Sequence, residues 1–191
     1  MSDLMASDLI TPDAGEPPLL SINEVSILKA APLTRLSLRL REASLKAAGS
    51  AFGVDLPVLP LSSATADKRA ALWMGPDEWT LFAPENTSQS VVSDIEGKLG
   101  AEPHSLVDVS ERSEAIIVSG QRAAWLLNTG IFVDFSIDTF PVGTVSRTIF
   151  HKSPVMVWRI GDEAFVVEAW VSFMDYVSGL LVQSASELSA A

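Results

Sequence analysis

Three short apolar runs near the C-terminal end of the sequence constrain the fold more than any other feature. They cover residues 144–150, 153–160 and 164–170, and each is rich in β-branched and aromatic side chains. Only a few residues separate one run from the next. A parallel pair of strands needs a crossover of a dozen or more residues, so these connections permit only antiparallel pairing. The sequence therefore predicts an antiparallel meander.

The remaining periodicity places helices and further strands around this meander. Leu36, Leu38 and Leu40 alternate with polar residues, as on a strand with one buried face. Apolar residues at helical spacing, capping residues and turn residues predict the other elements: helices over 42–52, 86–100, 121–130 and 171–190, a hairpin over 70–83, and strands over 105–109 and 114–120.

This element order predicts an α+β fold, a largely antiparallel sheet with flanking helices. The ferredoxin-like split βαβ unit is the nearest simple motif for the first half. Residues 1–20 mix Asp, Glu, Pro and Gly without a period, so we expect a flexible N-terminal tail and a single domain over residues 21–188.

Charge and composition argue against several classes of function. The 191-residue chain carries a net charge of −11 without a cluster of Lys or Arg, which disfavours nucleic acid and anionic membranes as partners. Its lack of cysteine rules out disulfides, thiolate zinc sites and a cysteine nucleophile. No run approaches the ~20 apolar residues of a membrane helix, and the N-terminus is unlike a signal peptide. We therefore expect a cytoplasmic protein.

The common catalytic and cofactor motifs do not occur. His104 and His151 lie in different segments, and neither has a partner at metal-ligand spacing. The glycines form neither a phosphate-binding loop nor a nucleophile elbow around a serine. We expect no catalytic residue, cofactor or metal site on this chain.

One polar corner leaves two interpretations open. Asp108 and Arg112 flank a strand–turn–strand junction with two glutamates beside them. The pair could grip a polar ligand of the folate type. The two side chains could equally satisfy each other and the donors of the turn, and this structural interpretation is the preferred one.

The predicted hairpin places two tryptophans beside one tight turn. Trp73 and Trp79 bracket Gly-Pro-Asp-Glu with apolar residues on both flanks. Most of the five tryptophans should lie in the core, but a ring beside a tight turn often ends near the surface, where it can anchor a protein interface. Stacking of the two rings across the hairpin is the alternative. We expect one ring in the core and the other against a neighbour, and Trp79→Ala to weaken assembly while leaving the isolated fold intact.

Three motifs, in this order, resemble the gamma subunit of bacterial heterotetrameric sarcosine oxidase. They are a Leu-Trp-hydrophobic-Gly-Pro-Asp-Glu-Trp run at 72–79, Val-Asp-hydrophobic-Ser-x-Arg at 107–112, and Phe-Pro-x-Gly at 140–143. The resemblance extends over roughly residues 30–185. It also implies a fold like the folate-binding domain of glycine-cleavage T-proteins and the related module of a tRNA-modification GTPase.

The resemblance implies a place in an oxidase complex. That family demethylates sarcosine oxidatively to glycine, with FAD, FMN, NAD, tetrahydrofolate and zinc carried by other subunits. The gamma chain would be a structural subunit that packs chiefly on the alpha subunit, beside beta and delta. Candidate interface residues are Trp73 and Trp79 of the hairpin, and Phe173 and Tyr176 of the C-terminal helix. The alternative is a stand-alone folate-binding or aminomethyl-transfer-like domain that uses Asp108 and Arg112, although no carboxylate matches the T-protein's catalytic acid.

Overall fold

The computed structural model describes residues 9–22 and 24–188, and this part of the chain forms two compact units. Unit 1 consists of Pro32–Ser110 together with Leu9. Unit 2 combines Ile10–Ala31 with the chain from Glu111 onward. Where the sequence predicts one domain over 21–188, the structure thus has two units with separate hydrophobic cores.

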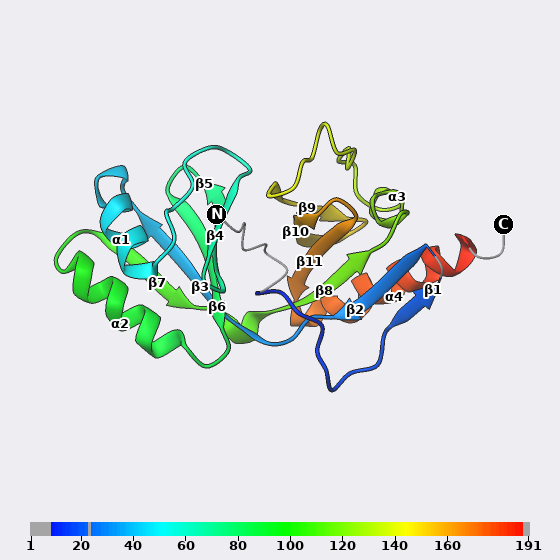
Figure 1. Ribbon diagram of the computed structural model, residues 1–191, viewed down its shortest axis with the longest axis horizontal. Helices are drawn as coiled ribbons and strands as arrows, with labels where there is room; N and C mark the ends of the chain where they lie inside the picture. The colour runs from blue at the N-terminus through cyan, green and yellow to red at the C-terminus, as the bar shows by residue number, and fades with distance from the viewer. Residues whose placement is uncertain (1–8, 23, 189–191) are drawn as a thin grey trace. The chain divides into compact units, whose positions relative to one another are not determined.

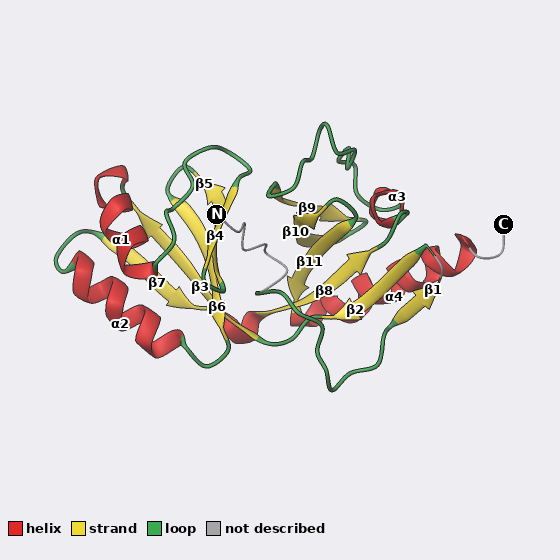
Figure 2. Ribbon diagram, in the orientation of Figure 1, coloured by secondary structure: helices red, strands yellow, loops and turns green. Residues whose placement is uncertain are grey.

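Unit 1 is a five-stranded antiparallel sheet with two α-helices (Figures 1 and 2). In chain order its elements are β3 (Leu33–Leu40), a 3₁₀ turn (Glu42–Ser44), α1 (Leu45–Phe52), β4 (Ser63–Ala66), β5 (Arg69–Gly75), β6 (Glu78–Pro84), α2 (Ser88–Leu99) and β7 (His104–Asp108). The strand order is β4-β5-β6-β3-β7. Without the edge strand β4, this is the ferredoxin-like arrangement that the sequence predicts.

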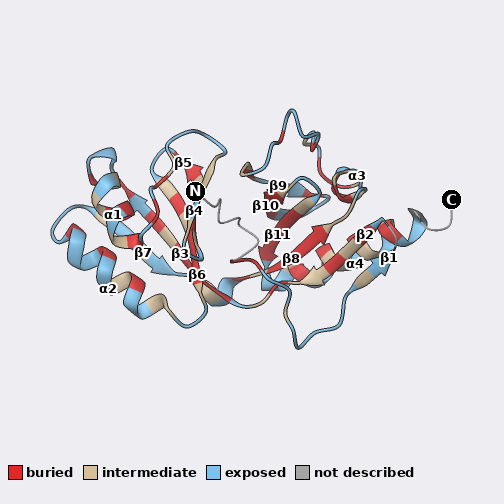
Figure 3. Ribbon diagram, viewed as in Figure 1, coloured by how far each residue is buried: buried red, intermediate tan, exposed pale blue. Residues whose placement is uncertain are grey.

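The core of unit 1 lies between the sheet and both helices. Leu36 and Leu38 of β3 are fully buried, as their alternation with polar residues predicts. The same apolar cluster contains Phe52 of α1 and Ile95 of α2, so both helices cover the same face of the sheet. Figure 3 shows the exposed residues of these helices on their outer sides.

Unit 2 is a six-stranded antiparallel sheet with α3 and α4. Its elements are β1 (Leu20–Ile22), β2 (Val25–Lys29), β8 (Ser113–Ser119), α3 (Ala123–Asn128), β9 (Val145–Phe150), β10 (Ser153–Gly161), β11 (Ala164–Trp170) and α4 (Val171–Leu188). A 3₁₀ turn, η3 (Ser110–Arg112), precedes β8. The predicted meander is confirmed, because β9 pairs with β10 and β10 with β11, both antiparallel.

The two units share one strand order. Unit 1 reads β4-β5-β6-β3-β7, and unit 2 reads β9-β10-β11-β8-β2 with β1 added at its edge. Strands β8 to β11 thus correspond to β3 to β6 in both sheet position and chain order. Strand β2 has the sheet position of β7 but a different place in the chain. β7 follows the second helix of its unit, whereas β2 comes from the beginning of the chain. Unit 1 is therefore inserted between two segments that together make unit 2.

The predicted N-terminal tail is partly structured. Its residues 1–8 lie outside the described residues. Beyond them, the backbone N–H groups of Asp13 and Leu19 donate to the carbonyls of Lys29 and Ile27 at 2.9 Å each. Residues 20–22 already form β1 against β2. Residues 10–20 thus belong to unit 2, and the bonds of Asp13 and Leu19 hold them along β2.

Among the described residues, no helix combines the length and the apolar character needed to cross a membrane.

Candidate functional site

The hairpin of β5 and β6 places Trp73 directly opposite Trp79. Both side chains pack on the helix-covered face of the unit 1 sheet. Trp79 is only 1% exposed, and its indole N–H donates to the Pro57 carbonyl at 2.8 Å. Trp73 is partly buried at the margin of the same cluster. The predicted hairpin is present, but Trp79 is a core residue with almost no surface for a partner to cover. The expectation of an interface role therefore remains only for Trp73, and the burial of Trp79 argues against the expectation that Trp79→Ala leaves the isolated fold intact.

Asp108 ends β7 in a network of hydroxyl groups. Its carboxylate accepts hydrogen bonds from the Ser110 N–H at 2.9 Å, the Ser110 hydroxyl at 2.6 Å and the Ser88 hydroxyl. The hydrogen bonds from Ser110 and Ser88 hold the pKa of Asp108 below its usual value. The Ser110 hydroxyl also accepts the N–H of Arg35 at 3.0 Å. Asp108 thus ties the end of β7 to β3 and to the beginning of α2.

Arg112 is not among the hydrogen-bond partners of Asp108. It is exposed at the end of η3 and belongs to unit 2, whereas Asp108 belongs to unit 1. The polar corner that the sequence predicts is therefore divided between the two units. The serine contacts agree with the structural interpretation of Asp108.

The beginning of α4 carries an aromatic surface. Tyr176 is 42% exposed, and Phe173 is partly buried against the core of unit 2. Trp170, the last residue of β11, is 51% exposed, and its ring centroid lies 6.2 Å from that of Phe173. Val171 beside it is also exposed. We call Trp170, Val171, Phe173 and Tyr176 the α4 surface. Helical periodicity indicated two of its members, but the exposure of Trp170 has no sequence signal, since its strand reads as buried.

A second exposed tryptophan occurs on α3. Trp125 lies under the guanidinium of Arg122, which is 4.8 Å from its ring centroid. Arg122 also pairs with Glu24 at 3.6 Å. Of the five tryptophans, Trp79 and Trp158 are fully buried and Trp73 packs against the core of unit 1, whereas Trp125 and Trp170 are exposed. The sequence feature that sets Trp125 apart is Arg122 one turn earlier, on the same helix face.

Arg159 binds backbone carbonyls of the loop between α3 and β9. No sequence motif indicates this role. It is 4% exposed, and its guanidinium donates to the carbonyls of Phe135 and Phe140 at 2.9 Å each. It also donates to the carbonyls of Gly161, at 3.2 Å, and Asp162. Burial lowers the pKa of Arg159. The sequence places Arg159 within the apolar run of β10, and a buried charged side chain is not expected in such a run.

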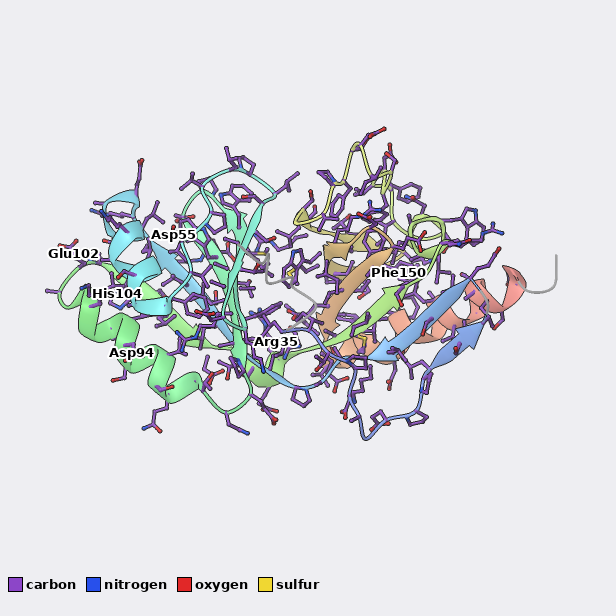
Figure 4. All side chains as sticks on the ribbon, viewed as in Figure 1. Arg35, Asp55, Asp94, Glu102, His104 and Phe150 are labelled. Atoms are coloured by element: carbon purple, nitrogen blue, oxygen red, sulfur yellow. The ribbon has the colours of Figure 1, made fainter. Side chains whose placement is uncertain are left out.

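The two histidines belong to different units, and each contacts its own neighbours in the sequence. His104 has its Nδ1 2.7 Å from the Glu102 carbonyl, and Figure 4 labels both residues. The ring of His151 meets Phe150 edge-on at 4.8 Å. Within residues 9–22 and 24–188, no three His, Cys, Asp or Glu side chains converge as a metal site would require.

Comparison with known proteins identifies the family. The model of the family described as "Sarcosine oxidase, gamma subunit family" matches residues 41–187. The chain belongs to this family. The resemblance carried by the three sequence motifs is thereby confirmed.

Relatives of the gamma family match over most of their length. Sarcosine oxidase subunit gamma of Corynebacterium sp. strain U-96 is 31% identical over 170 residues, which cover 87% of this chain and 82% of the relative. The subunit gamma of an Arthrobacter species is 28% identical over 145 residues, covering 75% and 70%.

Solved structures support the same fold. A chain of the heterotetrameric sarcosine oxidase from Corynebacterium sp. U-96, in complex with pyrrole 2-carboxylate, matches with a TM-score of 0.83 and 30% identity, covering 91% of this chain and 90% of that one. The glycine cleavage aminomethyltransferase T of Bartonella henselae matches with a TM-score of 0.63 at 8% identity, covering 83% and 45%. The second match concerns the fold alone. The predicted α+β class with a T-protein-like fold is confirmed.

Proposed function

We propose that this chain is a non-catalytic assembly subunit of a heterotetrameric sarcosine oxidase, which demethylates sarcosine oxidatively to glycine. The observation that carries the proposal is the match over nine-tenths of both chains to a subunit of such an oxidase. In this role the chain packs chiefly on the alpha subunit, within a complex that also contains beta and delta. FAD, FMN, NAD, tetrahydrofolate and zinc belong to the other subunits, and the complex is cytoplasmic.

The use of polar groups within the chain supports a structural role. Asp108 accepts hydrogen bonds from two serines, and Arg159 donates to four backbone carbonyls. These two groups therefore serve the fold directly. A catalytic group would instead need to be presented to a substrate.

The proposed contact with the partner lies on exposed and partly buried aromatic residues. Trp73 at the margin of the hairpin and the α4 surface with Phe173 and Tyr176 are the candidates. Tryptophan and tyrosine are enriched among residues that dominate binding energy, and a stable interface buries ~1,600 Å² in total. The exposure of Trp170 makes the α4 surface the stronger candidate of the two.

Co-expression tests this proposal. A tagged form of this chain is produced with the alpha, beta and delta subunits, and we expect all four to co-purify with sarcosine oxidase activity. The chain produced alone should fold without turning over sarcosine. Turnover of sarcosine by the single chain, or its failure to co-purify with the other three, contradicts the proposal.

The folate alternative has its own readout. Calorimetric titration of the isolated chain with tetrahydrofolate should give no binding heat if its role is assembly alone. Micromolar binding, about −8 kcal/mol, with loss on Arg112→Ala would favour the stand-alone folate-binding domain instead.

A further inference from the structure

The loop between α3 and β9, residues 129–144, exposes three large apolar side chains. Phe132 is fully exposed at 102%, while Ile137 is 46% and Val142 45% exposed. Each buried CH₂ is worth about 0.8 kcal/mol, so a fully exposed phenylalanine contributes none of its burial energy to this fold. We call residues 129–144 the α3–β9 loop, which projects beyond the strands of unit 2 in Figure 1.

The first half of the α3–β9 loop is fixed by hydrogen bonds. The side-chain amide of Asn128 donates to the carbonyls of Ile131, at 3.3 Å, and Val133, which flank Phe132. Asp134 then closes a turn by accepting the N–H of Ser136 at 2.8 Å. The backbone on both sides of Phe132 is thus held in place while its ring stays in solvent.

The second half of the loop is fixed from the core. The rings of Phe135 and Phe140 meet edge-on at 5.0 Å, and Phe135 meets Phe165 at 5.6 Å. Arg159 binds the carbonyls of both loop phenylalanines. Because these contacts order the loop in advance, little conformational entropy remains to be lost when Phe132, Ile137 or Val142 meets another surface.

The loop also has a defined charge. The sequence contains no Lys, Arg or His between Arg122 and Arg147, and the loop carries Asp134 and Asp138. The net charge of the whole chain is −11. A surface that complements this loop is apolar at its centre and positively charged at its rim.

We propose that the α3–β9 loop is a preformed anchor that inserts Phe132 into an apolar pocket, rimmed by Lys or Arg, on another subunit of the oxidase. The inference rests on the proposed assembly function and adds a contact distinct from the α4 surface. Exposed apolar side chains on a rigid support, flanked by charge of one sign, are suited to this role.

Binding of variants to the other subunits tests the anchor. The alpha, beta and delta subunits are co-purified without this chain and immobilised, and the dissociation constant of the added chain is measured. We expect Phe132→Ala to raise the dissociation constant at least about tenfold, as for a central interface residue. Leu59→Ala is the matched control, because Leu59 is 70% exposed and lies outside the loop. It should change the constant by less than about threefold.

A charge-reversal variant tests the proposed positive charge around the pocket. Asp138→Lys should slow association about threefold or more at low ionic strength, and salt should reduce this difference. Circular dichroism and thermal unfolding should be unchanged in Phe132→Ala, since the removed ring is fully exposed.

The outcomes separate this inference from the assembly function. Wild-type binding together with unchanged binding of Phe132→Ala, or an equal loss in Leu59→Ala, overturns the anchor and leaves the assembly function intact. Faster association of Asp138→Lys overturns the proposed charge of the pocket rim. Failure of the wild-type chain to bind overturns the assembly function and the anchor together.

Discussion

Gly120 follows β8 with a backbone φ of +116°, a region that other L-residues rarely adopt. A Cβ at this position would lie 2.3 Å from the Glu24 carbonyl oxygen. The close approach joins β8 to the beginning of β2. We expect Gly120→Ala to lower the free energy of unfolding by about 2 kcal/mol or more, through backbone strain and the displaced carbonyl.

Gly97→Ala is the matched control for this substitution. Gly97 lies within α2, where an added Cβ would meet nothing within 4 Å. Alanine there should stabilise the protein by about 0.5–1 kcal/mol through helix propensity. Denaturant unfolding measures the free energy of unfolding of both variants and of the wild type. Equal stability of Gly120→Ala and the wild type would show that the strand connection relaxes without cost.

The lowered pKa of Asp108 predicts that the stability of unit 1 depends on pH. This pKa is lowered in the folded state, so the stabilising contribution of Asp108 is complete above the pKa of the unfolded chain, roughly 4. The contribution is lost as pH falls through the folded-state pKa. We expect Asp108→Asn to be less stable than the wild type at pH 7, with the difference shrinking as unfolding is measured at successively lower pH.

Ser88→Ala serves as the control for the origin of this effect. It removes one of the hydroxyl donors to the Asp108 carboxylate and leaves both Ser110 contacts. The pH-dependent difference between wild type and Asp108→Asn should therefore be reduced, but not abolished, in the Ser88→Ala background. A difference that stays constant with pH would mean that Asp108 stabilises the protein through packing alone.

In the β5–β6 hairpin, Trp73 and Trp79 differ in burial, and we expect their substitution to differ in its cost to stability. Trp79→Ala should cost about 3–5 kcal/mol of unfolding free energy, because it opens a cavity and leaves the Pro57 carbonyl without its donor. Trp73→Ala should cost less, since that ring is only partly buried. Thermal and denaturant unfolding of the isolated chain measure both. A Trp79→Ala variant as stable as Trp73→Ala would contradict its assignment to the core.

Local periodicity predicts elements well because it records which face of each element is buried. The alternation through Leu36 and Leu38 gave β3, and short breaks gave the meander of β9 to β11. Local periodicity does not predict strand order, because β2 pairs with β8 about ninety residues later in the sequence. The division into two sheets therefore had no local signal.

The sequence indicates which residues are candidates for the site, but it does not show which of them are buried and which are exposed. Trp73 and Trp79 bracket one turn, and tertiary contacts such as the hydrogen bond from Trp79 to the Pro57 carbonyl distinguish them. Phe132 lies among six other apolar residues between 131 and 142, some buried and some exposed, in a loop whose backbone Arg159 binds through the Phe135 and Phe140 carbonyls. Burial of this kind is set by tertiary contacts, which no sequence period encodes.

At the scale of the whole molecule, unit 2 depends on residues separated by all of unit 1. β2 pairs with β8 and contributes Val25 and Ile27 to the core of unit 2. Both residues precede the matched family range of 41–187. A fragment beginning at Glu111 would therefore expose the β8 edge and part of an apolar face, a combination that favours aggregation.

A permuted form of unit 2 tests this dependence. Joining residues 10–31 after Leu188 through a flexible Gly/Ser linker would place β2 after α4, as β7 follows α2 in unit 1. We expect this chain, residues 111–188 followed by 10–31, to fold cooperatively by circular dichroism and denaturant unfolding. The fragment 111–188 alone should unfold or aggregate, and Ile27→Asp, which places a charge in the core, should have the same effect on the permuted chain. Equal folding of the fragment without residues 10–31 would show that unit 2 is complete without its N-terminal strands.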